Sequence, residues 1–179
     1  MTALDLLEQL DHFVREATAD LLTPVRVARE SGERKIRAPK VYKMRLPSKD
    51  DETRQIPYVL LQFIKSTVTW DEGERPRHQA TVRIVAATYS EKGDEGAGNT
   101  LNLLTRIQLS LLRAGMIADR YILESGLEII VYPDNVPPYY LGEMITVWTM
   151  PPIDTKSPLP GAEYEGRLPV VESEGSETW

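Results

Sequence analysis

The fold is decided by two stretches, YVLLQFIKSTVTW at residues 58–70 and QATVRIVAATYS at residues 79–90. Both are rich in β-branched and aromatic residues, and the polar segment 71–78 that separates them contains a glycine and a proline. This pattern predicts a long β-hairpin. Apolar residues occupy both alternating faces from Tyr58 to Ile64, which is typical of a strand covered on both sides. We therefore expect this strand near the centre of a sheet.

An amphipathic helix is predicted before the hairpin, over residues 3–22. Apolar residues recur there at helical spacing, namely Leu7, Leu10, Val14, Ala17 and Leu21. Thr2 and Asp5 offer a capping pair for the first amides, and Pro24 ends the helix because proline has no amide hydrogen. Both ends of the helix are therefore marked in the sequence.

A second helix is predicted after the hairpin, from Asn99 as its cap to Ala114, with Gly115 following it. The glycine-rich segment 93–98 before it is expected to be a flexible loop. Three leucines fall outside the main apolar stripe of this helix, namely Leu103, Leu109 and Leu112. They could meet a second layer of the same chain or another subunit. Because a chain of this length has little material left to cover them, we favour a subunit interface.

A short strand ending at Pro47 is predicted before the hairpin, with one apolar and one cationic face. Its alternating residues are Tyr42, Lys43, Met44, Arg45 and Leu46. Apolar segments at 121–132, broken at Ser125-Gly126, and at 141–150 supply the last strands. The expected fold is one α+β domain over residues 1–150, with a mostly antiparallel sheet of about four to five strands and two helices on one face.

Charge is distributed unevenly along the chain. The formal net charge is −6, yet segment 24–50 contains nine basic and three acidic residues, while segment 151–179 contains two basic and six acidic residues. The second segment is also rich in proline and is expected to be an extended acidic tail. The cations we single out in the basic block are Arg34, Lys35, Arg37, Lys40, Lys43 and Arg45.

Composition excludes several kinds of chemistry. With no cysteine among its 179 residues, the chain has no disulfides, thiolate metal sites or cysteine nucleophiles. Neither histidine, His12 or His78, has a second histidine at the H-x-x-x-H spacing. We assign no catalytic, cofactor-binding or metal-binding residue, and we expect a soluble, non-enzymatic protein without an export signal or a membrane partner.

The order and texture of these segments resemble those of bacteriophage tail terminator (tail completion) proteins. The segments that carry the resemblance are the first helix, IPYVLLQF, ATVRIVAATYS, the helix GNTLNLLTRIQLSLLRAG and the closing strand LGEMITVWTMPP, within residues 3–152. The resemblance implies a structural virion protein whose subunits form a ring, commonly hexameric, at the end of the tail tube. Such a ring stops tube growth and joins the tube to the head connector.

The same resemblance implies the partners and the location of the protein. It would contact copies of itself, the tail tube protein and a connector or neck protein, with DNA only passing through the channel. Assembly would take place in the bacterial host cytoplasm. The basic block would face the tube, a neighbouring protein or DNA in the lumen. The alternatives are a head–tail joining (neck) adaptor and a nucleic-acid-binding module that uses the cations of segment 24–49.

Overall fold

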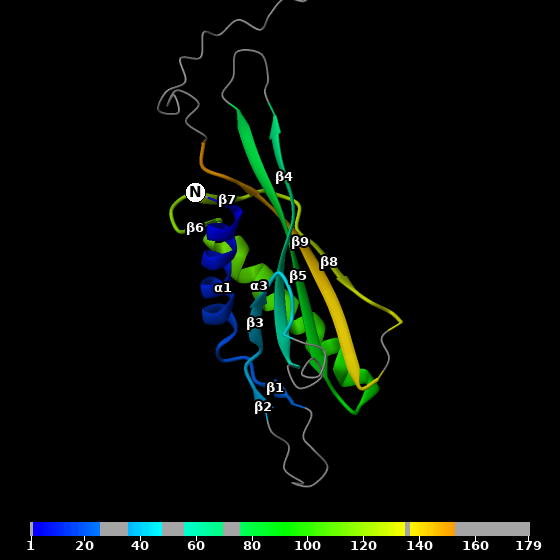
Figure 1. Cartoon of the computed structure of the whole chain (residues 1–179). Helices are drawn as coiled ribbons and strands as arrows, with labels where there is room; N and C mark the ends of the chain where they lie inside the picture. The colour runs from blue at the N-terminus through cyan, green and yellow to red at the C-terminus, as the bar shows by residue number, and fades with distance from the viewer. Residues whose placement is uncertain (1, 26–35, 48–55, 70–75, 135–136, 153–179) are drawn as a thin grey trace, which may run out of the picture.

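The computed structural model describes residues 2–25, 36–47, 56–69, 76–134 and 137–152, and Figure 1 traces their elements. The helices in these segments are α1 (Ala3–Thr18) and α3 (Gly93–Ala114). The strands are β1 (Thr23–Pro24), β2 (Ile36–Arg37), β3 (Lys40–Lys43), β4 (Tyr58–Thr69), β5 (Arg77–Tyr89), β6 (Met116–Ile117), β7 (Tyr121–Leu123), β8 (Glu128–Val131) and β9 (Tyr139–Thr149). Of the predicted tail, residues 153–179 lie outside the described residues.

The described strands form one large curled sheet and one small sheet. The large sheet has seven strands in the order β3-β4-β5-β9-β7-β6, with β8 also paired to β9, and the small sheet pairs β1 with β2. Every pair is antiparallel except β3 with β4. The predicted α+β class and the mostly antiparallel sheet are confirmed. The expected four to five strands are too few, because strands of two to four residues such as β6 and β7 are too short to produce a clear alternation.

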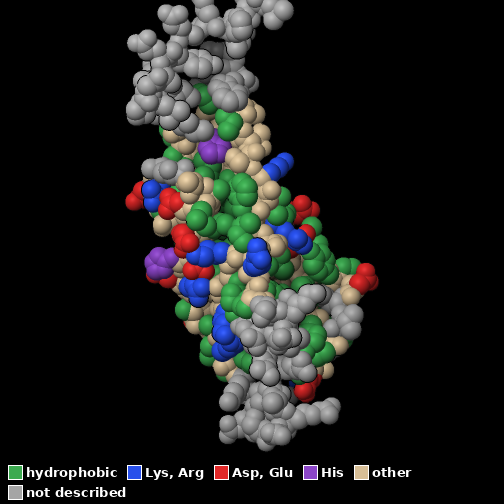
Figure 2. All heavy atoms as spheres, in the orientation of Figure 1, with side chains coloured by type: hydrophobic (Ala, Val, Ile, Leu, Met, Phe, Trp, Pro, Cys, Tyr) green, Lys and Arg blue, Asp and Glu red, His purple; other side chains and the backbone are tan. Residues whose placement is uncertain are grey.

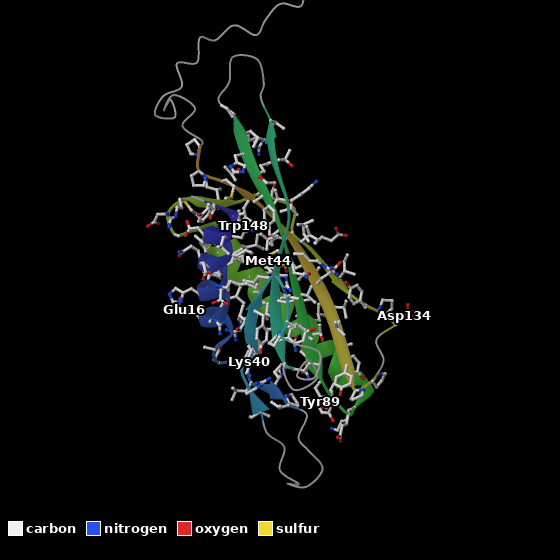
Figure 3. All side chains as sticks on the ribbon, viewed as in Figure 1. Glu16, Lys40, Met44, Tyr89, Asp134 and Trp148 are labelled. Atoms are coloured by element: carbon white, nitrogen blue, oxygen red, sulfur yellow. The ribbon has the colours of Figure 1, made fainter. Side chains whose placement is uncertain are left out.

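Both helices pack on the same face of the large sheet, as predicted (Figure 1). The main core lies between the two helices and the sheet. It includes Leu6, Leu10, Leu61, Ile84, Leu104, Ile107, Met144 and Trp148. Trp148, labelled in Figure 3, is supplied by β9 and is only 1% exposed. Alternate residues of the strands point away from this core, to what we call the helix-free face of the sheet.

A second, smaller apolar cluster lies on the helix-free face. It consists of Ile56, Tyr58, Leu60, Val85 and Ala87. Segment 58–61 of β4 is therefore buried on both faces, and β4 lies between β3 and β5. This confirms the central position that the sequence predicts for the first half of the strand. The second half is mostly exposed.

Helix α1 begins where the sequence predicts. The Thr2 hydroxyl accepts a hydrogen bond from the Asp5 amide at 3.3 Å, which satisfies one of the free amides of the first turn. The helix ends at Thr18, four residues earlier than expected. The Leu21 amide still donates to the Thr18 carbonyl at 3.1 Å, but the chain then extends into β1 at Thr23.

The predicted loop at 93–98 is wrong, because α3 already begins at Gly93 and Asn99 lies inside it. The reason is a close approach between helix and sheet. Gly96 is buried against the ring of Tyr140, where a Cβ atom would overlap the ring. A glycine at this position permits close packing, although glycine-rich sequence usually indicates a loop.

The first strand of the sheet is also shorter than predicted. It ends at Lys43, and Met44 adopts a positive φ of 64°, which turns the chain out of the strand before Pro47. Lys40 and Met44, labelled in Figure 3, stand at the beginning and just beyond the end of β3. The alternation of residues 42–46 is therefore not that of a single strand.

Candidate assembly surfaces

Exposed leucines cover the outer side of α3. Leu109 is 45% exposed and Leu112 is 54% exposed. Leu101, about two helical turns before Leu109, is exposed to a similar extent. Large apolar side chains on the surface of a helix are available for contact with another protein. Two of the three predicted interface residues therefore lie where an interface is possible.

The third predicted interface residue, Leu103, is a core residue. Its side chain is fully buried in the cluster that contains Leu7 and Leu10 of α1. The sequence analysis favoured another subunit over a second layer of the same chain as the cover for this side of α3. In fact α1 packs against α3 and covers it, so the wide apolar circumference of α3 reflects contacts with both the sheet and α1.

The basic block does not form a single cationic face. Lys43 shares the helix side of β3 with the buried Val41, and it forms an ion pair with Glu8 of α1. Arg37 donates a hydrogen bond to the Ile56 carbonyl at 3.1 Å, and burial lowers the pKa of its guanidinium. Both cations are thus engaged within the protein.

The remaining cations of the block are dispersed. Lys40 is exposed on the face of β3 opposite to Lys43, and Arg45 is exposed beyond the turn. Arg34 and Lys35 lie outside the described residues. Basic, acidic and apolar side chains are interspersed over the face shown in Figure 2. The predicted cationic strand face is therefore wrong.

The helix-free face carries polar side chains over much of its area. One row of paired positions crosses the sheet through Thr67, Gln79, Thr149, Ile122 and Met116. Three of these five side chains are polar and uncharged, whereas Ile122 and Met116 form an exposed apolar end of the row. No helix in the described part of the chain covers this row.

A charged network lies lower on the helix-free face, between β5 and β9. Arg83 forms an ion pair with Glu143 and donates a hydrogen bond to the Tyr132 hydroxyl at 2.9 Å, and that hydroxyl donates to Glu143 at 2.7 Å. Burial and the bond to Glu143 raise the pKa of Tyr132. The sequence analysis missed this network. A usable signal was that Arg83 and Glu143 are charged residues on the same alternating face of two predicted strands.

A second charged group ties the hairpin to the loop after β7. Glu124 accepts hydrogen bonds from Thr149 and from Arg77, the latter at 3.0 Å. These bonds, the one from Thr149 first, lower the pKa of Glu124. These bonds hold the start of β5 and the end of β9 to the segment that follows β7. Figure 1 shows the outer ends of β4 and β5 extending past both helices.

The histidines occupy ordinary surface positions. His12 pairs with Glu16 at 3.6 Å, and the His78 ring forms a hydrogen bond with the Ser66 hydroxyl at 2.7 Å. Within the described segments there is no group of three or more side chains suited to hold a metal ion. Neither described helix has the length and apolar character needed to span a bilayer.

No protein-family model matches the chain, and no curated protein matches its sequence.

Proposed function

We propose that the chain is a tail terminator subunit, a structural virion protein. Copies of it form a ring that caps the phage tail tube, stops its growth and joins it to the head connector. One observation carries the proposal. Both helices lie on one face of a curled antiparallel sheet, and the outer half of the opposite face is free of described helices and rich in uncharged polar side chains.

This arrangement suits a subunit that lines a channel. DNA carries a dense negative charge, and a wall of lysine and arginine would retain it. Thr67 offers a weak, uncharged contact, Thr149 is bonded to Glu124, which also pairs with Arg77, and Arg83 is neutralised by Glu143. A ring with the helix-free face inward would let DNA pass without holding it.

The outward side of the same ring would carry α3. Leu109 and Leu112 would then contact a neighbouring subunit or the tube protein. A ring requires heterologous contacts, in which one patch of a subunit meets a different patch of the next.

A head–tail joining adaptor is the alternative with the same shape requirements. The nucleic-acid-binding module has less support, because Lys43 is paired with Glu8 and Arg37 is bonded to Ile56, which leaves fewer cations for phosphate.

The test measures solution mass by light scattering and then mixes the protein with purified tail tubes for negative-stain microscopy. A ring-sized mass and capped tube ends of fixed length are expected. An adaptor would bind connectors and leave tube length unchanged. A protein that stays monomeric and leaves tube ends bare would contradict the proposal. The matched variant is Leu109→Glu/Leu112→Glu, with Glu16→Lys on α1 as the exposed control.

A further inference from the structure

The strand order of the large sheet ends at β3 and β6, and two further strand edges carry no neighbouring strand in the described structure. The first is the β4 edge, the outer side of residues 62–69, because β3 pairs with β4 only from Tyr58 to Leu61. The second is the β8 edge, the outer side of residues 128–131, because β9 pairs with the other side of β8. Unpaired strand edges present free amides and carbonyls that can bind another strand.

Alternation identifies the outward groups on the β4 edge. The Leu61 carbonyl accepts a hydrogen bond from the Met44 amide at 2.7 Å, so the backbone of Leu61 faces the β3 side. Backbone groups alternate sides along a strand, and the bulge between Phe63 and Lys65 shifts this alternation by one residue. Beyond the bulge, the backbone of Ser66 therefore faces outward.

The same reasoning applies to the β8 edge. The Tyr132 amide donates to the Leu141 carbonyl at 3.3 Å, so Tyr132 faces β9 and so does Ile130. The backbone groups of Ile129 and Val131 consequently face outward. Each edge thus offers hydrogen-bonding groups at residues whose side chains point to the helix side of the sheet.

Strand direction allows the two edges to meet. β4 is antiparallel to β5, β5 to β9 and β9 to β8, so β4 and β8 run in opposite directions. When a second copy is placed beside the first with its helices on the same side, its β8 runs antiparallel to β4. This is the geometry of a heterologous contact, which repeats from copy to copy and closes a ring.

Charge and apolar exposure on the two edges are complementary. In the strand register Lys65 lies opposite Thr81, and Glu128 lies opposite Ile145. Both charged side chains are therefore on the helix-free face. Both are exposed, and neither has an ion pair within the described residues. Ile64 on the β4 edge is 50% exposed and Ile130 on the β8 edge is 38% exposed. Contact between the edges would pair the charges and cover the isoleucines.

We propose that the β4 edge of one copy binds the β8 edge of the next, and that this contact joins the subunits of the ring, an inference that rests on the proposed function. Ser66 lies opposite Ile129, which puts Thr67 opposite Glu128 and Lys65 opposite Ile130. Lys65 and Glu128 are then diagonal neighbours within reach of each other. The sheet continues from subunit to subunit around the channel.

The first test uses the absence of cysteine from the chain. The variant Thr67→Cys/Glu128→Cys places thiols in a non-hydrogen-bonded pair across the contact, where the Cα atoms are about 4.5 Å apart and a disulfide can form. Inside one chain the two strands are separated by β5 and β9, hence by about 14 Å, which is too far for a disulfide. Any disulfide therefore joins two copies.

The expected result is a ladder of cross-linked species on a non-reducing gel after mild oxidation. The control Thr67→Cys/Glu16→Cys keeps the β4 thiol and moves the second thiol to an exposed position on α1. It is expected to give no more than random dimers. Equal cross-linking of both variants would overturn the contact.

The second test exchanges the charges. Lys65→Glu is expected to weaken association roughly fivefold by light scattering, and Lys65→Glu/Glu128→Lys is expected to restore it. A double variant as weak as the single one would overturn the pairing. Cross-linked rings that leave tail tubes uncapped would contradict the terminator function and keep the contact. Rings that cap the tubes but do not cross-link would contradict the contact between the β4 and β8 edges and keep the terminator function.

Discussion

Two glycines of α3 stand in different surroundings, and this difference gives a direct test of the packing. A methyl group at Gly96 would overlap the Tyr140 ring, whereas nothing lies within 4 Å of the corresponding point at Gly98. Gly96→Ala is expected to lower the free energy of unfolding by about 1–3 kcal/mol, because the helix or the ring must move. Gly98→Ala is expected to raise it by about 0.5–1 kcal/mol through higher helix propensity. Urea unfolding of both variants checks this, and equal stability would contradict the close approach.

A hydrogen bond between Tyr121 and Asp5 makes stability depend on pH at both ends of the scale. The Tyr121 hydroxyl donates to the Asp5 carboxylate at 2.5 Å. Burial and this bond raise the pKa of Tyr121 to about 12, and the bond, with nearby Arg120, lowers the pKa of Asp5. The protonated phenol is favoured in the folded state, so its contribution is present below about pH 10 and is lost as the pH rises towards about 12.

The carboxylate behaves in the opposite sense. Because folding lowers the pKa of Asp5, its contribution is present above the ordinary value of 3.8 and is lost as the pH falls through the folded value. A plot of melting temperature against pH should therefore fall along an acidic limb and along an alkaline limb. Tyr121→Phe is expected to make the fall along both limbs less steep. Tyr139→Phe, which removes a hydroxyl from a ring packed on Tyr89, is the control and should leave both limbs in place. Unchanged limbs in Tyr121→Phe would assign them to other groups.

At the scale of elements, long periodic segments were predictable and short or closely packed ones were not. The hairpin strands lie within two residues of their predicted ends, because many alternating residues mark them. The start of α3 was missed because Gly96 serves a contact with Tyr140 that only the folded chain reveals. The end of β3 was missed because the positive φ of Met44 leaves no mark in an alternating sequence.

The leucines of α3 separate core from surface in one helix. Leu103 is fully buried in the main core, and Leu109 is 45% exposed. Leu103→Ala is expected to lower the free energy of unfolding by about 2–5 kcal/mol, because it leaves a cavity in the core. Leu109→Ala is expected to change it by less than about 0.5 kcal/mol. Urea unfolding measures both, and similar losses would show that the monomer buries both faces. An effect of Leu109→Ala on mass or tube capping alone would place it in an interface.

At the scale of the whole molecule, the sheet has the properties that a ring subunit needs. One face is closed by α1 and α3, the other face has an outer polar row, and the open edges of β4 and β8 lie on opposite sides of the sheet. The sequence predicted an interface on the basis of leucines alone. It could not predict the edges, because an open edge depends on which strands are neighbours, and that order is not written in the periodicity of any one strand.

Proline substitutions distinguish the outward from the inward backbone of β4. Ser66→Pro removes an amide that faces the open edge, so the monomer should keep most of its stability while association falls at least about tenfold. Ser66→Ala is the control, because it removes only the side-chain bond to His78 and should leave association unchanged. Thr67→Pro removes an amide that faces Gln79 of β5 and should destabilise the monomer itself by about 1–3 kcal/mol. Light scattering and thermal unfolding separate the two effects. If Ser66→Pro associates like the unmodified chain, subunits join elsewhere, and the exposed leucines of α3 become the next surface to test.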